Sequence, residues 1–386
     1  MAMSNGKRIL LIENFSSDFY KARLPYALFL IEKGWDVYAL VPAGEYVNMI
    51  RDQGIKVVGY ELDRKDKGLF QLLRLLKIYK EIISKYDFNI IHSYRFQPNL
   101  LNVLVNFFNG RKVIIHITGL GIAFSNNSLK YSVLRIFSQL IFQVKLFRAN
   151  QVIVQNYDDA KDLWLTDILW KKKVQVIKGS GVNISFFNSE NFNRESIRKT
   201  FNLSANHRVF ICVTRLLWEK GILEMVEAFS SEEIQIFYPK IQLWLVGWSD
   251  KDNPRHIPSE YIERANNNKN ILFLGKSDKI PELLVASDVF LYPSYYREGI
   301  PRGILEALSM SLPVITTNLP GCNLTVKEGV NGFLIDGRSS LAITQAIKKI
   351  LTPSDFENMG VESRKIAEQY FSEDIIFKKI ENLYQI

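Results

Sequence analysis

The sequence predicts two α/β domains in tandem, each with a parallel sheet that helices cover on both faces. Short apolar runs bounded by glycine or polar residues alternate with amphipathic stretches, the pattern typical of parallel sheets. The 386 residues, 47% of them hydrophobic, are enough for two cores. Midway lies a stretch rich in Gly, Asn and Ser, "KGSGVNISFFNSENFN". We therefore expect domains over residues 1–182 and 183–370, with a terminal helix at 371–386 that packs back toward the first domain.

In the first half, each expected strand is a short apolar run and each helix has a period of 3.6 residues. "RILLI" at 8–12 is a strand, and the helix at 22–34 ends at a glycine. The stretch at 69–86 is strongly periodic and predicts a longer helix. Further strands are expected at 36–42, 89–94, 112–118, 151–156 and 174–182.

The second half repeats the pattern, which predicts a second parallel sheet. Helices are expected between its strands, for example at 221–229 and 302–310. The expected strands lie at 209–214, 242–247, 270–275, 288–294, 312–317 and 331–335.

The net charge of +9 is concentrated in the first half of the chain. Residues 1–189 carry 26 Lys and Arg against 15 Asp and Glu, and residues 88–157 contain no carboxylate. A one-sided positive field indicates an anionic partner, although a solvated basic face would look the same. No nucleic-acid motif is present, so nucleic acid is not the expected partner.

The cysteines and the hydropathy pattern indicate the compartment. The two cysteines form no disulfide framework and no zinc spacing, which favours a reducing compartment. We find no secretory signal at the N-terminus and no apolar run of about 18 residues, so no membrane span is expected.

The loop "YYREGIP" (295–301) precedes the expected helix at 302–310. It lies at the carboxyl end of a parallel strand, where open α/β sheets bind ligands. The N–H groups of Gly299, Ile300 and the residues after Pro301 have no partner within the helix and carry the positive end of its dipole. They form an anion site, and Pro301 suits the first helical turn.

Two carboxylates flank this anion site. Glu298 stands just before it, and Glu306 lies two turns into the helix, about 12 Å along its axis. At that separation they cannot share a proton, but they can hold hydroxyls at the two ends of a long ligand. Alternatively, Glu298 is a loop charge and Glu306 a solvated helix residue.

A second constellation, "TRLLWEKG", follows the first strand of the second domain. Arg215 and Lys220 lie on its strand–helix loop, and Gly221 lets the chain turn into the helix. Arg supplies a bidentate fork and Lys a point charge, so the two cations predict a diphosphate clamp. The alternative is a basic pair on the surface.

These motifs resemble those of a known family. "TRLLWEKGILEMVEAF", "LWLVG", "LFLG", "LYPSYYREGIPRGILEALSMSLPVITTNLPGC" and "GVNGFLI" resemble, in order and spacing, the retaining GT-B glycosyltransferases of family four. "HITGLGIAF" and "VQVIKGSGVN" resemble the bacterial subgroup that builds surface polysaccharides and lipid-linked oligosaccharides. The resemblance implies the GT-B fold, with two Rossmann-like domains that face each other across a cleft.

The resemblance also implies a role for each matching position. Arg215 and Lys220 would neutralise the nucleotide diphosphate of the donor. Glu298 would contact hydroxyls of the donor sugar, and Glu306 would hold the ribose hydroxyls. The other donor contacts would come from main-chain groups of Gly299, Ile300 and Pro301 and from strand-end loops at Gly247 and Gly275.

Two histidines are further candidates near strand ends. His116 precedes "TGLG", where Gly119 would let the backbone approach the donor sugar, and we include both residues in the expected site. His92 is a weaker candidate. A single histidine in an apolar run is more often a packed, structural residue, and this alternative stays open.

The expected chemistry needs no cofactor. Negative charge grows on the leaving diphosphate, where preorganised donors stabilise it. Arg plus Lys can replace a divalent cation and no Asp-x-Asp stands at a strand end, so we expect metal independence. The family retains the anomeric configuration, with the leaving phosphate taking the acceptor proton.

The chain departs from the family pattern at three places. The double glycine usual after the first strand is replaced by "ENFSSDFYKARLP", which puts the acceptor side in doubt. Ser311 stands where glycine is usual, and Asn323 where many members have arginine. Arg302 could reach an acceptor phosphate or lie on the helix surface.

Together these features predict a hexosyl- or N-acetylhexosaminyltransferase at the inner face of a bacterial membrane. The donor is expected to be a UDP-sugar, best a UDP-N-acetylhexosamine, and the acceptor a polyprenyl-diphosphate-linked saccharide. The segment 129–150, apolar with interspersed cations, would contact the anionic membrane surface, or else be a core helix with snorkelling cations. The rival functions are a UDP-sugar 2-epimerase of the same architecture and a non-catalytic nucleotide-sugar-binding protein.

Overall fold

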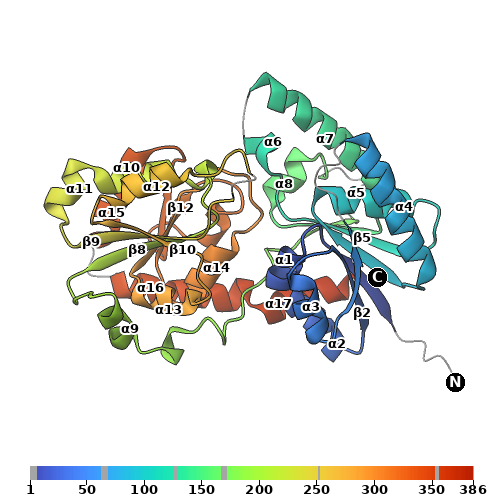
Figure 1. The fold of residues 1–386 in the computed structure, drawn as a ribbon, viewed down its shortest axis with the longest axis horizontal. Coiled ribbons are helices and arrows are strands. Elements are labelled where there is room, and N and C mark those ends of the chain that lie inside the picture. Colours follow the sequence, from blue (N-terminus) through green and yellow to red (C-terminus); the bar gives the residue numbers. More distant parts are fainter. Residues whose placement is uncertain are drawn as a thin grey trace. The chain divides into compact units, whose positions relative to one another are not determined.

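The computed structural model describes residues 7–61, 68–125, 128–166, 172–250, 253–352 and 356–385. Its contacts divide the chain into two compact units (Figure 1). Unit 1 comprises Met1–Ser180 and Asp374–Ile386, and unit 2 comprises Gly181–Glu373. Each unit is built on a parallel sheet, so the predicted α/β class is confirmed.

The seven-stranded sheet of unit 1 has the order β3-β2-β1-β4-β5-β6-β7. Successive residues of its first strand point to opposite faces, and both faces are buried: Ile9 and Leu11 pack in one cluster, Leu10 and Ile12 in another. The strands are β1 Arg8–Ile12, β2 Asp36–Pro42, β3 Lys56–Tyr60, β4 Ile90–Tyr94, β5 Lys112–Ile117, β6 Gln151–Val154 and β7 Val174–Val176.

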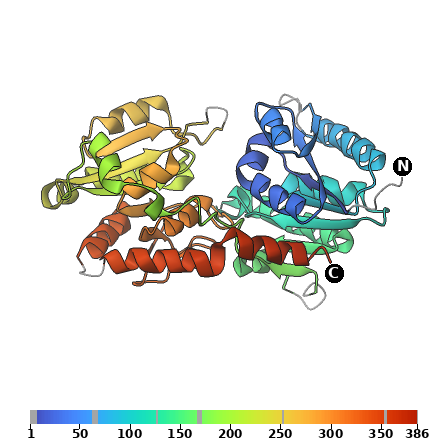
Figure 2. The same ribbon diagram turned by 90° about the horizontal axis from the view of Figure 1, so that it is seen from below.

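Helices cover both faces of this sheet. Helices α2, α3 and α17 lie on one face, and α4, α5 and α7 on the other. Figure 2 shows α17, in red, against unit 1, where Phe377, Ile380 and Tyr384 are buried. The helices are α1 Ser16–Asp18, η1 Phe19–Arg23, α2 Leu24–Glu32, α3 Tyr46–Asp52, α4 Leu69–Lys85, α5 Phe96–Val105, α6 Ile122–Ser125, α7 Leu129–Arg148, α8 Tyr157–Asp162 and α17 Glu373–Asn382.

The sheet of unit 2 has six strands in the order β10-β9-β8-β11-β12-β13. Helices α10, α11 and α15 lie on one side of it, and α9, α13 and α16 on the other (Figure 1). The strands are β8 Arg208–Val213, β9 Ile241–Val246, β10 Ile271–Gly275, β11 Val289–Tyr292, β12 Val314–Thr317 and β13 Gly332–Ile335. The helices are η2 Ser189–Asn191, α9 Arg194–Thr200, η3 Trp218–Lys220, α10 Ile222–Ser230, α11 Glu232–Phe237, α12 Ser259–Asn266, α13 Ile280–Ala286, α14 Arg302–Ser309, η4 Asn323–Thr325, α15 Ser340–Leu351, α16 Phe356–Ile366 and η5 Ala367–Phe371.

The structure differs from the expected elements of unit 1 in several places. Strand β7 ends at Val176 rather than at residue 182, and two further differences lie in the first 60 residues. The helix expected at 22–34 begins earlier, because α1, the π-helical turn η1 and α2 follow one another from Ser16 to Glu32. Strand β3 was not expected. Its burial is mixed, since it is the edge strand of the sheet, and the apolar signal is therefore weak.

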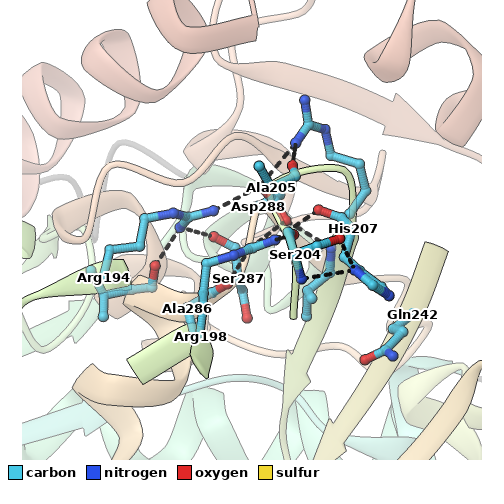
Figure 3. Close-up of polar contacts among 12 residues, drawn as sticks. Arg194, Arg198, Ser204, Ala205, His207, Gln242, Ala286, Ser287 and Asp288 are labelled. Carbon is cyan, nitrogen blue, oxygen red and sulfur yellow. Dashed lines mark hydrogen bonds and ion pairs between the residues drawn. The ribbon is translucent and has the colours of Figure 1, made fainter. Parts of the chain in front are cut away.

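An arginine-rich cluster anchors α9 at the amino ends of β8 and β11 (Figure 3). The buried Asp288 carboxylate accepts hydrogen bonds from Arg194 at 2.7 Å, from Arg198 at 3.2 Å and from the Val209 N–H at 2.8 Å. Arg198 also donates to the Ala286 carbonyl. These contacts fix α9 at the amino-terminal edge of the sheet. The candidate site described below lies at the opposite, carboxyl-terminal edge.

Candidate functional site

Three of the predicted donor residues, Arg215, Lys220 and Glu298, lie at the point where the strand order of unit 2 reverses. β8 and β11 are neighbours there, and their connections leave in opposite directions. The loop with Arg215 and Lys220 follows β8, and the loop with Glu298 follows β11. Such switch points are where open α/β sheets bind ligands.

Lys220 and Glu298 form an ion pair between these two loops, in which the Lys220 side chain is buried and the Glu298 side chain is 18% exposed. The Lys220 ammonium donates to a Glu298 carboxylate oxygen and, at 3.1 Å, to the Tyr292 hydroxyl. The same carboxylate oxygen accepts from the Tyr292 hydroxyl at 2.7 Å and from the Ser294 hydroxyl at 3.0 Å. Burial raises the pKa of Glu298, but Lys220 and the two hydroxyls outweigh it, so that the pKa lies below its ordinary value. Glu298 is therefore an ionised acceptor.

Sequence reasoning missed Tyr292 and Ser294, which orient the Glu298 carboxylate. Tyr292 looked like a core aromatic residue because it ends the apolar strand "VFLY". The hydroxyl pattern in "LYPS", directly before the loop, was the available signal.

Close packing fixes the loop after β8. Gly221 has φ +76°, and a Cβ there would lie 2.6 Å from the Pro293 carbonyl oxygen. A Cβ at Gly247 would lie 1.7 Å from the Thr214 carbonyl oxygen. Only glycine fits at these contacts, which hold the Arg215 loop against the ends of β9 and β11. Arg215 itself is exposed.

The start of α14 is also closely packed. Gly299, Ile300 and Pro301 are buried, and a Cβ at Gly321 would lie 1.6 Å from the Gly299 carbonyl oxygen. Pro301 occupies the N-cap rather than the first helical turn that we expected, because its ψ of 122° is extended. The intrahelical ladder begins with the Ile304 N–H donating to Pro301. The N–H groups that precede Ile304 at the start of α14 have no acceptor within the helix and can therefore bind an anion.

Glu306 lies on α14, one turn after Arg302. The Arg302 guanidinium donates to its carboxylate at 3.3 Å. Burial raises the pKa of Glu306 above its ordinary value, and Arg302 offsets this only in part. Arg302 is thus paired along its own helix in this structure.

The candidates His116, His92 and Gly119 belong to unit 1. His116 lies within β5 and is 1% exposed, and His92 lies within β4 and is 0% exposed. The His92 Nδ1 is 2.6 Å from the Tyr384 hydroxyl. Burial lowers the pKa of His92 to about 3. The surroundings of both rings are those of packed histidines. Gly119 follows β5 with φ +133°.

The departures from the expected sequence pattern have structural counterparts. Ser311 has φ +61°, the left-handed conformation that glycine adopts without strain. In place of a double glycine, β1 is followed by Glu13, which is fully buried and paired with Arg23 at 3.2 Å and with Arg95 at 3.0 Å. The loop after β1 is thus a charged cluster.

Within the described ranges, no group of three His, Cys, Asp or Glu side chains could hold a metal ion. The same ranges contain no helix that is long and apolar enough to cross a bilayer.

The chain is thus a two-domain α/β protein. In unit 2, a cation–carboxylate pair and a helix N-terminus lie at the switch point of the sheet. Residues 193–367 match the family model "Glycosyl transferases group 1", and residues 8–156 match "Glycosyl transferase 4-like". Residues 193–367 thus form a group 1 glycosyltransferase domain, and residues 8–156 form a glycosyl transferase 4-like domain. It is a glycosyltransferase.

Curated relatives carry glycosyltransferase names over most of the chain. The N,N'-diacetylbacillosaminyl-diphospho-undecaprenol α-1,3-N-acetylgalactosaminyltransferase of Campylobacter jejuni is 25% identical over 98% of both chains. The UDP-Gal:α-D-GlcNAc-diphosphoundecaprenol α-1,3-galactosyltransferase of Escherichia coli is 28% identical over 80% of this chain and 77% of its own.

Solved structures show the same fold. A glycosyltransferase from Rickettsia africae superposes with a TM-score of 0.78, at 21% identity over 99% of this chain and 98% of its own. Sucrose-phosphate synthase from Thermosynechococcus elongatus superposes with a TM-score of 0.81, at 20% identity over 98% of both chains. The two Rossmann-like domains of the GT-B fold are thereby confirmed.

Proposed function

We propose that this glycosyltransferase moves a hexose or N-acetylhexosamine from a UDP donor to a polyprenyl-diphosphate-linked saccharide, in the synthesis of a bacterial surface glycan. The observation that carries the donor side is the Lys220–Glu298 pair beside the N-terminus of α14. Lys220 and Arg215 bind the diphosphate, and Glu298 accepts hydrogen bonds from sugar hydroxyls. The acceptor class rests on the two undecaprenyl-diphosphate relatives.

The charges of the site support a reaction without metal. As the glycosidic bond breaks, negative charge develops on the diphosphate, where Lys220, Arg215 and the α14 N–H groups stabilise it most. The leaving phosphate takes the proton of the acceptor hydroxyl, which attacks from the same face of the sugar. The anomeric configuration is then retained, and no protein base is needed.

A thermal-shift screen of UDP, GDP and ADP with their sugar conjugates, with and without EDTA, tests the donor side. A ligand that binds only the folded state raises Tm. We expect UDP and one UDP-sugar to raise Tm, each by the same amount with and without EDTA. A response to GDP or ADP instead would overturn the donor assignment, and a response that requires Mg²⁺ or Mn²⁺ would overturn metal independence.

Acceptor-dependent turnover tests the reaction itself. With a UDP-sugar and a lipid-linked acceptor, UDP release should require the acceptor, and NMR of the product should show the anomeric configuration of the donor. UDP release without an acceptor, together with the 2-epimer of the donor sugar in the NMR spectrum, would instead indicate an epimerase.

We further propose that α7 contacts the cytoplasmic leaflet of the membrane, through apolar side chains rather than cations. Two of the cations expected at the membrane surface are engaged within unit 1, because Lys145 is 0% exposed and Arg148 donates to the carbonyls of Asn106 and Arg111. Instead, apolar side chains at helical spacing lie more than half exposed along one stripe. They are Leu129, Val133, Ile136, Phe137, Leu140, Val144 and Phe147.

Flotation with vesicles of phosphatidylethanolamine and phosphatidylglycerol tests this contact. Phe137→Ser with Leu140→Ser should reduce bound protein at least tenfold. Ile236→Ser with Phe237→Ser, which removes equally exposed apolar side chains from α11 of unit 2, should leave it unchanged. If 0.5 M salt abolishes vesicle binding by the wild type, the contact is electrostatic and the proposed apolar contact is contradicted.

A further inference from the structure

Unit 1 carries a second cluster of charged side chains at the switch point of its own sheet. β1 and β4 are neighbours there, and Glu13 and Arg95 directly follow them. Arg95 pairs with the buried Glu13 at 3.0 Å and with Asp18 at 2.5 Å. Arg23 completes the cluster through Glu13 at 3.2 Å. The sheet topology thus gives unit 1 an edge of the kind at which open α/β sheets bind ligands.

The charges of this cluster favour a neutral polar ligand over an anion. Two carboxylates face two guanidinium groups, so the cluster offers an anion little net attraction. The side chains of Asp18 and Arg95 are 35% and 38% exposed. They present an acceptor and a donor side by side, which is the arrangement that sugar hydroxyls require.

The backbone holds Arg95 in a strained conformation. Its φ of 70° and ψ of 175° lie in a region that is nearly restricted to glycine, and its N–H donates to the His116 carbonyl at 3.1 Å. Such a residue costs about 1–3 kcal/mol and persists where the surroundings fix it. The direction in which the Cα–Cβ bond of Arg95 leaves the backbone is therefore determined by the fold.

A small, mostly apolar cavity of about 50 Å³ opens beside Arg95. It is lined by residues of the loops after β4 and β5 and by α5, α6 and α7, among them Phe96, Leu120, Phe124, Ser138 and Phe142. This volume holds about three or four water-sized groups, the size of an acetamido substituent. A whole sugar ring does not fit.

Contacts with each other and with Lys145 fix two aromatic side chains of the cavity wall, Phe96 and Phe142. The rings of Phe96 and Phe142 meet edge to face, with centroids 5.5 Å apart. The buried Lys145 ammonium lies 3.8 Å and 4.1 Å from their centroids and donates to the Phe96 carbonyl at 3.2 Å. The cavity is therefore preformed, as small-molecule subsites usually are.

We propose that this cavity binds the acetamido group of an N-acetylhexosamine in the acceptor, while Arg95 and Asp18 contact hydroxyls of the same sugar. The acetyl methyl packs on Phe96, Phe124 and Phe142, and Ser138 is the polar partner of the amide. The inference deepens the proposed function and rests on it, since it assumes a saccharide acceptor. On this proposal, unit 1 determines the specificity of the enzyme for acceptors that carry an N-acetyl group.

Saturation-transfer NMR tests the cavity without turnover. The probe is N-acetylglucosaminyl diphosphate with a ten-carbon alkyl chain, in the presence of saturating UDP to occupy unit 2. We expect the acetyl methyl to receive more saturation than the sugar ring protons in the wild type, and to lose it in Ser138→Leu, which fills the cavity. Ser132→Leu, the same change on α7 outside the cavity lining, should retain it.

Kinetics with matched acceptors gives the second readout. The wild type should prefer the N-acetylglucosaminyl acceptor over its glucosyl counterpart by at least tenfold in kcat/KM. Ser138→Leu should remove that preference by raising the acceptor KM, with the donor KM within twofold of the wild type. If Ser138→Leu does not fold, Phe124→Ala widens the cavity from α6 and should also reduce the preference.

The outcomes separate this inference from the proposed function. Transfer to both acceptors at equal rates, with no excess saturation of the methyl, overturns the cavity assignment and leaves the function intact. Saturation of the alkyl chain in place of the acetyl group also overturns it and makes the cavity a lipid subsite. A saturated methyl without transfer to any acceptor upholds the cavity and refutes the proposed function.

Discussion

Replacing Glu298 by Gln separates the two roles assigned to the Lys220–Glu298 pair. The change keeps the size of the side chain, and the amide oxygen can still accept from Tyr292 and Ser294. It removes the negative charge that pairs with the Lys220 ammonium, whose side chain is 6% exposed. Leaving one partner of a buried pair uncompensated costs about 3–5 kcal/mol, and retained hydrogen bonds should limit the cost here to about 2–3 kcal/mol.

Glu298→Gln should lower stability because Lys220 loses its counter-charge, and should lower turnover because a donor-sugar hydroxyl loses a charged hydrogen-bond acceptor. A lost hydrogen bond between a charged group and a sugar hydroxyl is worth about 1.5–3 kcal/mol, which corresponds to roughly 10- to 150-fold in kcat/KM. UDP affinity should not fall, because Lys220 loses its internal counter-charge and is free to pair with phosphate. Lys220→Met should do the opposite and weaken UDP binding at least tenfold.

The assay is a double-mutant cycle on these two residues. Urea unfolding gives the free energies of unfolding, calorimetry gives the Kd for UDP, and UDP release gives kcat/KM. We expect a coupling free energy of about 1–3 kcal/mol between the two positions. A coupling below about 0.5 kcal/mol, or wild-type kcat/KM in Glu298→Gln, would refute the reasoning.

The pH dependence of stability gives an independent check on this pair. The pKa of Glu298 in the folded state lies below its ordinary value of 4.5. The carboxylate therefore contributes stability that is present above pH 4.5 and is lost as the pH falls through the folded pKa. Glu298→Gln should show a smaller loss of stability in this acid range than the wild type.

Three further predictions follow from other buried ionisable groups. Because burial raises the pKa of Glu306, ionisation of this carboxyl lowers the stability of the wild type as the pH rises through that pKa. Glu306→Gln should therefore exceed the wild type in stability by more at pH 7.5 than at pH 4. Unchanged affinity of this variant for UDP would argue against the ribose role of Glu306. His92, with a pKa of about 3, should make unfolding easier by about 1.4 kcal/mol per pH unit as the pH falls from 6.5 toward 3, and urea titrations of His92→Gln should show a shallower slope. Asp288→Asn leaves its arginines unbalanced and should lower the free energy of unfolding by about 3–5 kcal/mol without changing the Kd for UDP; an altered Kd would contradict the structural role.

The sequence alone predicted the α/β class and most strands closely. β1 at Arg8–Ile12 and β2 at Asp36–Pro42 match the expected ranges, because buried parallel strands are continuous apolar runs between polar or glycine breaks. The edge strand β3 lacked that signal. The loops with Lys220 and Glu298 could be placed at strand ends, since their order in the chain fixes the edge of a parallel sheet to which they belong.

Only the tertiary structure decided which side chains meet. No sequence spacing predicts that Lys220 and Glu298, 78 residues apart, form one pair, because strand order and loop packing bring them together. The cations of α7 show the same limit: their number indicated a positive surface, but the fold buries Lys145 between two rings and leaves apolar side chains outside. Composition sets the charge of a segment, whereas packing sets where each charge lies.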